Sequence, residues 1–135
     1  MIYIDTGALI SRHLARDQYH QQSVAFWNII AKKEESCVTS NFVLDGAFAL
    51  LGRRGGYTFA AQRARNIYAS HNVKIIRPGL DDELKAIDLF EKYADQNLSF
   101  TDCVSLVLMQ TRKIKRVFTF DNHFQYLGFQ IFPKI

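Results

Sequence analysis

Three aspartates lie at the ends of apolar segments, where their carboxylates could bind a metal ion together. Asp5 follows the apolar residues 1–4, Asp121 follows the apolar residues 117–120, and Asp102 opens an apolar helical segment. In a parallel α/β sheet, the carboxyl ends of the strands and the amino ends of the helices meet at one edge, where ligands bind. The three positions therefore predict a carboxylate site for a hard divalent cation.

Each aspartate also has a purely structural interpretation as a helix cap. Asp5 and Asp121 precede predicted helices, and Asp102 follows Ser99 by three residues, close to a capping box, although that motif prefers Glu or Gln. Capping is the better interpretation of any one aspartate alone, but three at the same kind of junction favour a shared site. Close carboxylates repel one another, and a cation relieves this repulsion. An all-oxygen set favours Mg²⁺ or Mn²⁺.

The segments that would position these residues alternate between strand and helix. Short apolar runs predict strands at residues 2–4, 37–39, 73–76, 117–120 and 130–132. Capping residues and helical spacing predict helices from about residues 6, 17, 41, 58, 81 and 99, with a short one near residue 123. Residues 52–56, Gly-Arg-Arg-Gly-Gly, are expected to form a loop. The alternation predicts an α/β sandwich with a mostly parallel sheet of about five strands, in one domain over residues 1–135.

Composition predicts an ordinary globular protein of the cytoplasm. Hydrophobic residues make up 48% and charged residues 22% of the 135 residues. No apolar run is long enough to span a bilayer, and residues 1–5 do not resemble a signal peptide. Cys37 and Cys103 lie in apolar surroundings, which favours buried thiols in a reducing compartment over a disulfide or a zinc site.

The net charge of +4, with a pI of about 9.2, contrasts with the acidic character of the predicted site. The positive charge must therefore lie elsewhere on the surface. This distribution suits a polyanionic substrate, because basic flanks bind phosphates while a metal neutralises the reacting one. The same pI is also common among soluble proteins that bind no nucleic acid.

Four segments of the chain form a recognisable set: Ile2-Tyr3-Ile4-Asp5-Thr6, residues 39–45 (TSNFVLD), residues 98–103 (LSFTDC) and residues 118–124 (FTFDNHF). Together they resemble the PIN-domain ribonucleases, and most of all the VapC toxins of bacterial and archaeal toxin–antitoxin pairs. The resemblance covers nearly the whole chain, and the last two segments are the most specific. It implies a PIN-like three-layer sandwich with a parallel sheet of about five strands between helices.

The resemblance also implies an activity and a set of partners. Members of the family use a pocket of usually four acids to bind Mg²⁺ or Mn²⁺ and to cut RNA, leaving a 3′-hydroxyl and a 5′-phosphate. Asp5, Asp102 and Asp121 match three of those acids as metal ligands and catalytic residues, and Thr6 would be a supporting hydroxyl beside Asp5 that contributes to substrate binding. A cognate antitoxin and a homodimer are further expectations.

Position 46 departs from the family pattern, which has a glutamate after Val-Leu-Asp where this chain has Gly46. Glycine has no ligating side chain, and in a helix interior it costs about 1 kcal/mol relative to alanine. Three explanations remain open. Asp45 supplies the acid, although neighbouring helical residues point about 100° apart; the chain is a natural variant of weak or no activity; or the glycine was introduced or selected because the intact toxin harms its host, which we favour slightly.

The remaining candidates concern substrate and partner binding. Arg53 and Arg54, with Arg63 and Arg65, are the best candidates to bind RNA phosphates, and a solvated helical face is the alternative. We interpret His123 as a capping or surface residue, with a role in substrate binding as the alternative. The residues Phe26, Trp27 and Ile30 belong either to the core or to a groove for an antitoxin segment. A non-catalytic PIN-like module that binds RNA or protein is the competing function, because Gly46 removes an acid.

Overall fold

A five-stranded parallel sheet forms the centre of the computed structural model, which describes residues 1–134. The strands are β1 (Ile2–Ile4), β2 (Cys37–Ser40), β3 (Val73–Ile76), β4 (Arg116–Phe118) and β5 (Gln130–Phe132). Their order across the sheet is β3-β2-β1-β4-β5, and each neighbouring pair is parallel. The predicted α/β class and strand number are confirmed.

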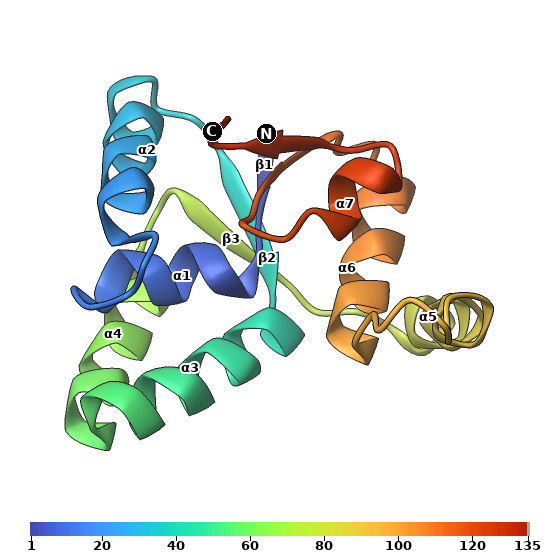
Figure 1. Cartoon of the computed structure of the whole chain (residues 1–135), viewed down its shortest axis with the longest axis horizontal. Helices are drawn as coiled ribbons and strands as arrows, with labels where there is room; N and C mark the ends of the chain where they lie inside the picture. Colours follow the sequence, from blue (N-terminus) through green and yellow to red (C-terminus); the bar gives the residue numbers. More distant parts are fainter. Residues whose placement is uncertain (135) are drawn as a thin grey trace.

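Seven helices cover the sheet in the described residues. They are α1 (Thr6–His13), α2 (His20–Lys32), α3 (Asn41–Gly55), α4 (Tyr57–Ala69), α5 (Leu80–Lys92), α6 (Phe100–Thr111) and α7 (His123–Tyr126). Figure 1 shows α1 to α4 on one side of the strands and α5 to α7 on the other. The predicted three-layer sandwich is therefore confirmed. In the described residues, no helix combines the length and the apolar character needed to cross a membrane.

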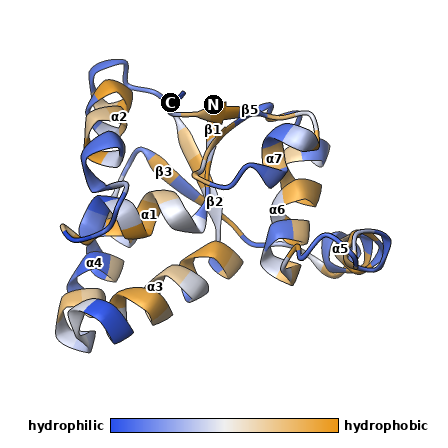
Figure 2. Ribbon diagram, in the orientation of Figure 1, coloured by the Kyte–Doolittle hydropathy of each residue, from blue (hydrophilic) through white to orange (hydrophobic). Residues whose placement is uncertain are grey.

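The central strand β1 is fully enclosed, which explains its continuous apolar sequence. Ile2, Tyr3 and Ile4 are each 0% exposed, and Figure 2 colours this strand as hydrophobic. Strands of parallel sheets are buried on both faces and therefore lack the alternation of half-exposed strands. The Tyr3 hydroxyl lies 2.8 Å from Ser105 Oγ on α6, so the polar atom in this core has a partner.

The predicted loop at residues 52–56 is wrong, because α3 continues to Gly55. Gly52 is buried, and a Cβ atom there would lie only 2.4 Å from Cε1 of Tyr57, so the glycine permits close packing rather than a turn. The chain turns at Gly56, whose φ of +94° favours glycine. The glycine-rich composition was therefore a signal for close helix packing as well as for a turn.

The fourth strand is also shorter than predicted. It ends at Phe118, whereas the apolar run continues to Phe120. Thr119 and Phe120 lie beyond the strand, where Thr119 is 2% exposed and its hydroxyl is used at the candidate active site. Both cysteines are free and buried, as predicted.

Candidate active site

The candidate site lies where the strand order reverses. From β1 the chain moves to β2 and β3 on one side, and it then returns to β4 on the other side of β1. Such a switch point leaves a crevice at the carboxyl ends of the strands, where ligands bind in open α/β sheets. Asp5 follows β1, and Asp121 lies just beyond β4. The crevice therefore receives side chains from both of these central strands.

A cavity of about 490 Å³ occupies this crevice. The structure brings Asp5, Asp102 and Asp121 to its wall together with Thr6. The remaining lining residues are Gly7, Ile10, Asp17, Gln18, Tyr19, Arg54, Ser99, Thr119 and Phe120. Three acids that are far apart in the sequence thus face one space.

Asp5 is the most buried of the three aspartates, with 6% of its surface exposed. It precedes α1, but among the described residues its side chain makes no capping hydrogen bond to that helix. Burial, followed by the nearby charge of Asp102, raises the pKa of Asp5 to about 6, although a hydrogen bond from Thr119 opposes the shift. The capping interpretation therefore does not account for Asp5.

Thr119 joins two of the aspartates, a role that was not predicted because Thr119 falls within the expected strand at residues 117–120. Its hydroxyl donates to Asp5 Oδ2 at 2.8 Å and accepts a hydrogen bond from the Asp121 backbone N–H at 3.0 Å. Both bonds lie in the crevice, where competition from water is low. Thr119 therefore fixes the position of the Asp121 backbone relative to the Asp5 carboxylate.

Asp102 combines the capping role with a place in the cavity wall. Its Oδ2 accepts the Ser99 backbone N–H at 3.0 Å, and the Ser99 hydroxyl accepts the Asp102 N–H at 3.0 Å, which completes a capping box at the start of α6. Burial is the main cause that raises the pKa of Asp102. The aspartate is thus held at the helix end by local bonds while it faces the cavity.

Asp121 is held by His123. Its Oδ1 accepts the His123 backbone N–H at 2.9 Å and also contacts the Nδ1 atom of the ring. The N-cap residue of α7 is Asn122, so Asp121 fixes the turn that leads into this helix. The half-buried His123 therefore orients Asp121 and has a structural partner of its own.

The chemistry of the donor set suits a hard divalent cation, but the three carboxylates do not form a closed chelate in their present rotamers. Within residues 1–134, no group of three or more His, Cys, Asp or Glu side chains lies close enough to hold one metal ion. Local hydrogen bonds hold one oxygen of Asp102 and one of Asp121 within their own segments.

The structure separates the two adjacent arginines that were predicted to bind substrate. Arg54 lines the cavity, whereas Arg53 is exposed and outside the lining. Successive residues of a helix point about 100° apart, so only one of the pair faces this space. Arg63 lies farther along, on α4, with its guanidinium 4.9 Å from the centre of the Phe59 ring. The prediction that Arg53 acts beside Arg54 is therefore not supported by its position.

Position 46 has room for a side chain. Gly46 is half-buried on α3, and a Cβ atom there would meet nothing within 4 Å. Neither Gly46 nor Asp45 belongs to the cavity lining, and Asp45 is the more exposed of the two, so the explanation that Asp45 supplies the missing acid stays a prediction. A glutamate side chain at position 46 would therefore fit without a clash at its Cβ atom, whereas the Asp45 side chain is exposed to solvent.

Two residues of the cavity wall, Asp17 and Tyr19, were missed because the loop between α1 and α2 follows no strand. Asp17 accepts the Tyr19 N–H at 2.9 Å and pairs with Arg54 at 3.9 Å. The Tyr19 ring stacks on Phe120, with ring centres 4.4 Å apart and planes inclined by 4°. An aspartate just before a helix carries a capping signal, and the sequence contains no hint that it faces the other acids.

Trp27 and Ile30 lie in the core, whereas Phe26 is half-buried and lines a small cavity together with Ile30, so the alternative of an antitoxin groove stays open. Trp27 and Ile30 are 7% and 5% exposed, and Trp27 Nε1 donates to the Ala8 carbonyl at 3.2 Å. The Phe26 ring packs edge-on against Phe118, with ring centres 4.7 Å apart. These residues join α2 to the sheet and to α1.

Comparison with known proteins identifies the family. Residues 2–130 match the family described as PIN domain. The 23S rRNA-specific endonuclease VapC20 of Mycobacterium tuberculosis, in strains CDC 1551 / Oshkosh and H37Rv, is 31% identical over 129 residues, which cover 96% of this chain and 95% of the relative. The crystal structure of M. tuberculosis VapC20, described as a sarcin–ricin loop cleaving toxin, matches with a TM-score of 0.86, 28% identity and 96% coverage of both chains. This chain is therefore a member of the PIN domain family.

Proposed function

We propose that this protein is a metal-dependent endoribonuclease and the toxin of a toxin–antitoxin pair. The observation that carries the proposal is the placement of Asp5, Asp102 and Asp121 around one cavity at the switch point of a PIN fold. The end-to-end similarity to an rRNA-specific endonuclease supports RNA as the substrate. The protein would act in the cytoplasm as a single PIN domain, as a homodimer and under control of a cognate antitoxin.

Asp5, Asp102 and Asp121 would hold Mg²⁺ or Mn²⁺ in this cavity. When bound, the ion polarises the scissile phosphate and lowers the pKa of an attacking water. Thr119 would keep Asp5 in place through its hydroxyl, and Arg54 would offer a cationic group to the RNA backbone from the cavity lining. One of the carboxylates accepts the proton of the water. The expected products carry a 3′-hydroxyl and a 5′-phosphate.

Gly46 would reduce this activity in the chain as it stands, because the family resemblance implies an acid ligand at this position and glycine has no side chain to supply one. Changing Gly46→Glu adds an acid at a position where a Cβ meets open space. The variant should therefore cut RNA faster and be more toxic in a host that lacks the antitoxin. Equal cleavage and toxicity for both forms would contradict this role of Gly46.

The test is cleavage of RNA that contains 23S rRNA by the purified protein with Mn²⁺. Three forms are compared: the chain as it stands, Gly46→Glu, and Gly46→Glu combined with Asp5→Asn. We expect the strongest cleavage from Gly46→Glu and its loss when Asp5 is also replaced. If cleavage survives Asp5→Asn, a contaminating nuclease or another site is responsible, and the proposal fails.

A second candidate function is a non-catalytic module that binds RNA or protein. The missing acid at position 46 favours it. Such a module would bind RNA equally well with and without Mn²⁺, and Gly46→Glu would still not cut it. The cleavage test therefore distinguishes the two functions.

A further inference from the structure

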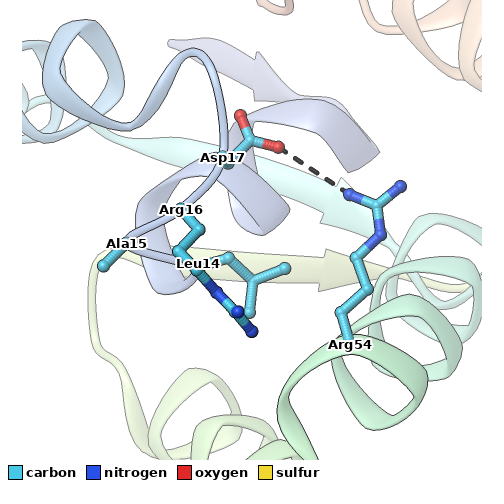
Figure 3. Close-up of a pocket in the computed structure, with 5 residues that line it drawn as sticks. All are labelled: Leu14, Ala15, Arg16, Asp17 and Arg54. Atoms are coloured by element: carbon cyan, nitrogen blue, oxygen red, sulfur yellow. Dashed lines mark ion pairs between the residues drawn. The ribbon is translucent and has the colours of Figure 1, made fainter.

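A second cavity adjoins the active-site cavity at the loop between α1 and α2. It has a volume of about 340 Å³ and is lined by Leu14, Ala15, Arg16, Asp17 and Arg54, as Figure 3 shows. Asp17 and Arg54 also line the active-site cavity. The ion pair that these two residues form therefore borders both cavities.

The two members of this ion pair are held very differently. Asp17 belongs to a tight turn, since its Oδ1 accepts the Tyr19 N–H at 2.9 Å and its own N–H donates to the Leu14 carbonyl at 3.0 Å. Arg54 lies in the last turn of α3, and its side chain is 56% exposed, against 15% for Asp17. The pair can therefore open by movement of the arginine while the aspartate stays in place.

The ion pair itself is weak. Arg54 Nη1 and Asp17 Oδ2 are 3.9 Å apart, which is longer than a charge-assisted hydrogen bond. Exposed pairs of this kind contribute little, because solvent screens the charges. A phosphate group offers the planar guanidinium a bidentate partner with better geometry. Arg54 can consequently exchange the Asp17 carboxylate for a phosphate of a bound RNA.

The second cavity has the chemistry of a nucleotide site. Arg16 and Arg54 carry positive charge, whereas Leu14 and Ala15 offer apolar surface. Its volume lies within the range of small-ligand sites, whose lower limit is about 300 Å³. One wall therefore suits a phosphate, and another suits the apolar face of a ribose or base.

We propose that this second cavity binds the RNA nucleotide next to the scissile phosphate, and that Asp17 is a positioning residue that occupies Arg54 until the phosphate of that nucleotide replaces it. The inference rests on the proposed ribonuclease function. In the free protein Asp17 holds Arg54 between the two cavities, and in the complex Arg54 binds RNA there. Asp17 thus competes with the substrate for the arginine.

The test is a double-mutant cycle on RNA binding. Binding of a fluorescently labelled single-stranded RNA is measured by anisotropy in EDTA, so that no RNA is cut. Asp17→Asn should tighten binding by about two- to fivefold, because an exposed ion pair of this strength no longer competes. Arg54→Ala should weaken binding and lower the salt dependence by about one phosphate contact. In the Arg54→Ala background, Asp17→Asn should have no effect.

Two neighbouring residues serve as matched controls. Arg53→Ala removes the same charge from the same helix turn but outside both cavities, and Asp45→Asn removes an exposed acid from α3. Arg53→Ala should change the affinity for RNA less than Arg54→Ala does, and Asp45→Asn should change it less than Asp17→Asn does. The proposal is overturned if Asp17→Asn weakens binding or leaves it unchanged, if its gain persists without Arg54, or if Arg53→Ala is as harmful as Arg54→Ala.

A scan of the RNA then locates the contact. Single methylphosphonate linkages, which are neutral, replace each phosphate in turn. For one neutral linkage, adjacent to the cut made by the Gly46→Glu variant, Arg54→Ala should no longer weaken RNA binding. If Gly46→Glu cuts RNA but no linkage shows this effect, the nucleotide subsite is wrong and the ribonuclease function stands. If no form binds or cuts RNA, both proposals fail.

Discussion

The two walls of the active-site cavity differ in how deeply their residues are buried and in which elements carry them. The sheet wall, formed by Asp5, Thr119 and Asp121, follows the central strands, and two of its residues are almost fully buried. The loop wall, formed by Asp17, Tyr19 and Arg54, combines an exposed arginine with a turn outside the sheet. The difference indicates that the sheet wall fixes the reacting groups, whereas the loop wall adapts to the substrate.

Substitutions in the sheet wall should therefore have the largest effects on catalysis. In the Gly46→Glu background, Asp5→Asn should lower RNA cleavage by more than about 100-fold, because even residues that merely support metal ligands are worth about 10- to 100-fold. Single-turnover cleavage with Mn²⁺ measures the effect, and circular dichroism checks the fold. A loss of less than threefold would show that the chemistry lies elsewhere.

The burial of Asp5 predicts a specific pH dependence of stability. Its pKa in the folded protein is about 6, above the ordinary value of 3.8, so folding favours the protonated form. The stabilisation of the folded state by protonated Asp5 is fully present below about pH 3.8 and is lost as the pH rises through about 6. In metal-free protein, the unfolding free energy relative to Asp5→Asn should thus fall by up to about 3 kcal/mol over this window.

Urea denaturation of the unchanged protein and of Asp5→Asn, at values from about pH 4 to about pH 7, measures this difference in unfolding free energy. At neutral pH, Mn²⁺ should raise the unfolding free energy of the unchanged protein by binding to its folded form. It should not raise the unfolding free energy of Asp5→Asn. A difference that rises with pH would have the wrong sign and would contradict the buried, repelled state of this carboxylate.

Thr119 should contribute through position alone. Thr119→Val keeps the shape of the side chain but removes the hydrogen bonds to Asp5 and to the Asp121 N–H. We expect a loss of about tenfold in cleavage by the Gly46→Glu form. A matched control is Thr111→Val, which removes the hydroxyl bond to the Val107 carbonyl on α6. Equal losses for both variants would point to a general effect on folding.

Substitutions in the loop wall should have the smallest effects and should act on substrate binding. In the Gly46→Glu background, Arg54→Ala should raise the KM for RNA more than it lowers kcat. The reason is that an exposed arginine binds the RNA backbone equally in the ground state and in the transition state. The steady-state parameters of both forms measure this split. A drop in kcat with unchanged KM would place Arg54 among the groups that act only in the transition state.

The sequence predicted the three aspartates of the cavity because strand ends and helix starts carry a clear signal. An apolar run followed by an aspartate marks both Asp5 and Asp121, and the helix that begins after Ser99 marks Asp102. The loop wall was not predictable in this way, since Asp17 comes near Arg54 only through the packing of α1 on α3 and of α2 on α1. Thr119 was hidden because a threonine in a β-run is an ordinary strand residue.

The glycines show where a local signal has two meanings. Residues 52–56 have the composition of a loop, but Gly52 lies inside α3 because the Tyr57 ring occupies the space of its missing side chain. Gly46, in contrast, is surrounded by open space at its Cβ position. Packing thus explains one helical glycine, whereas nothing in the structure requires the other.

Binding of Mn²⁺ tests the central claim most directly, because it depends neither on an RNA target nor on turnover. Titration calorimetry of the chain as it stands is compared with Asp5→Asn, Asp102→Asn and the exposed control Asp45→Asn. The carboxylate site predicts that Mn²⁺ binds to the unchanged protein and to Asp45→Asn, and that binding is lost or weakened by at least about tenfold in the other two. Equal binding by all four forms would contradict a metal site at the switch point of the sheet.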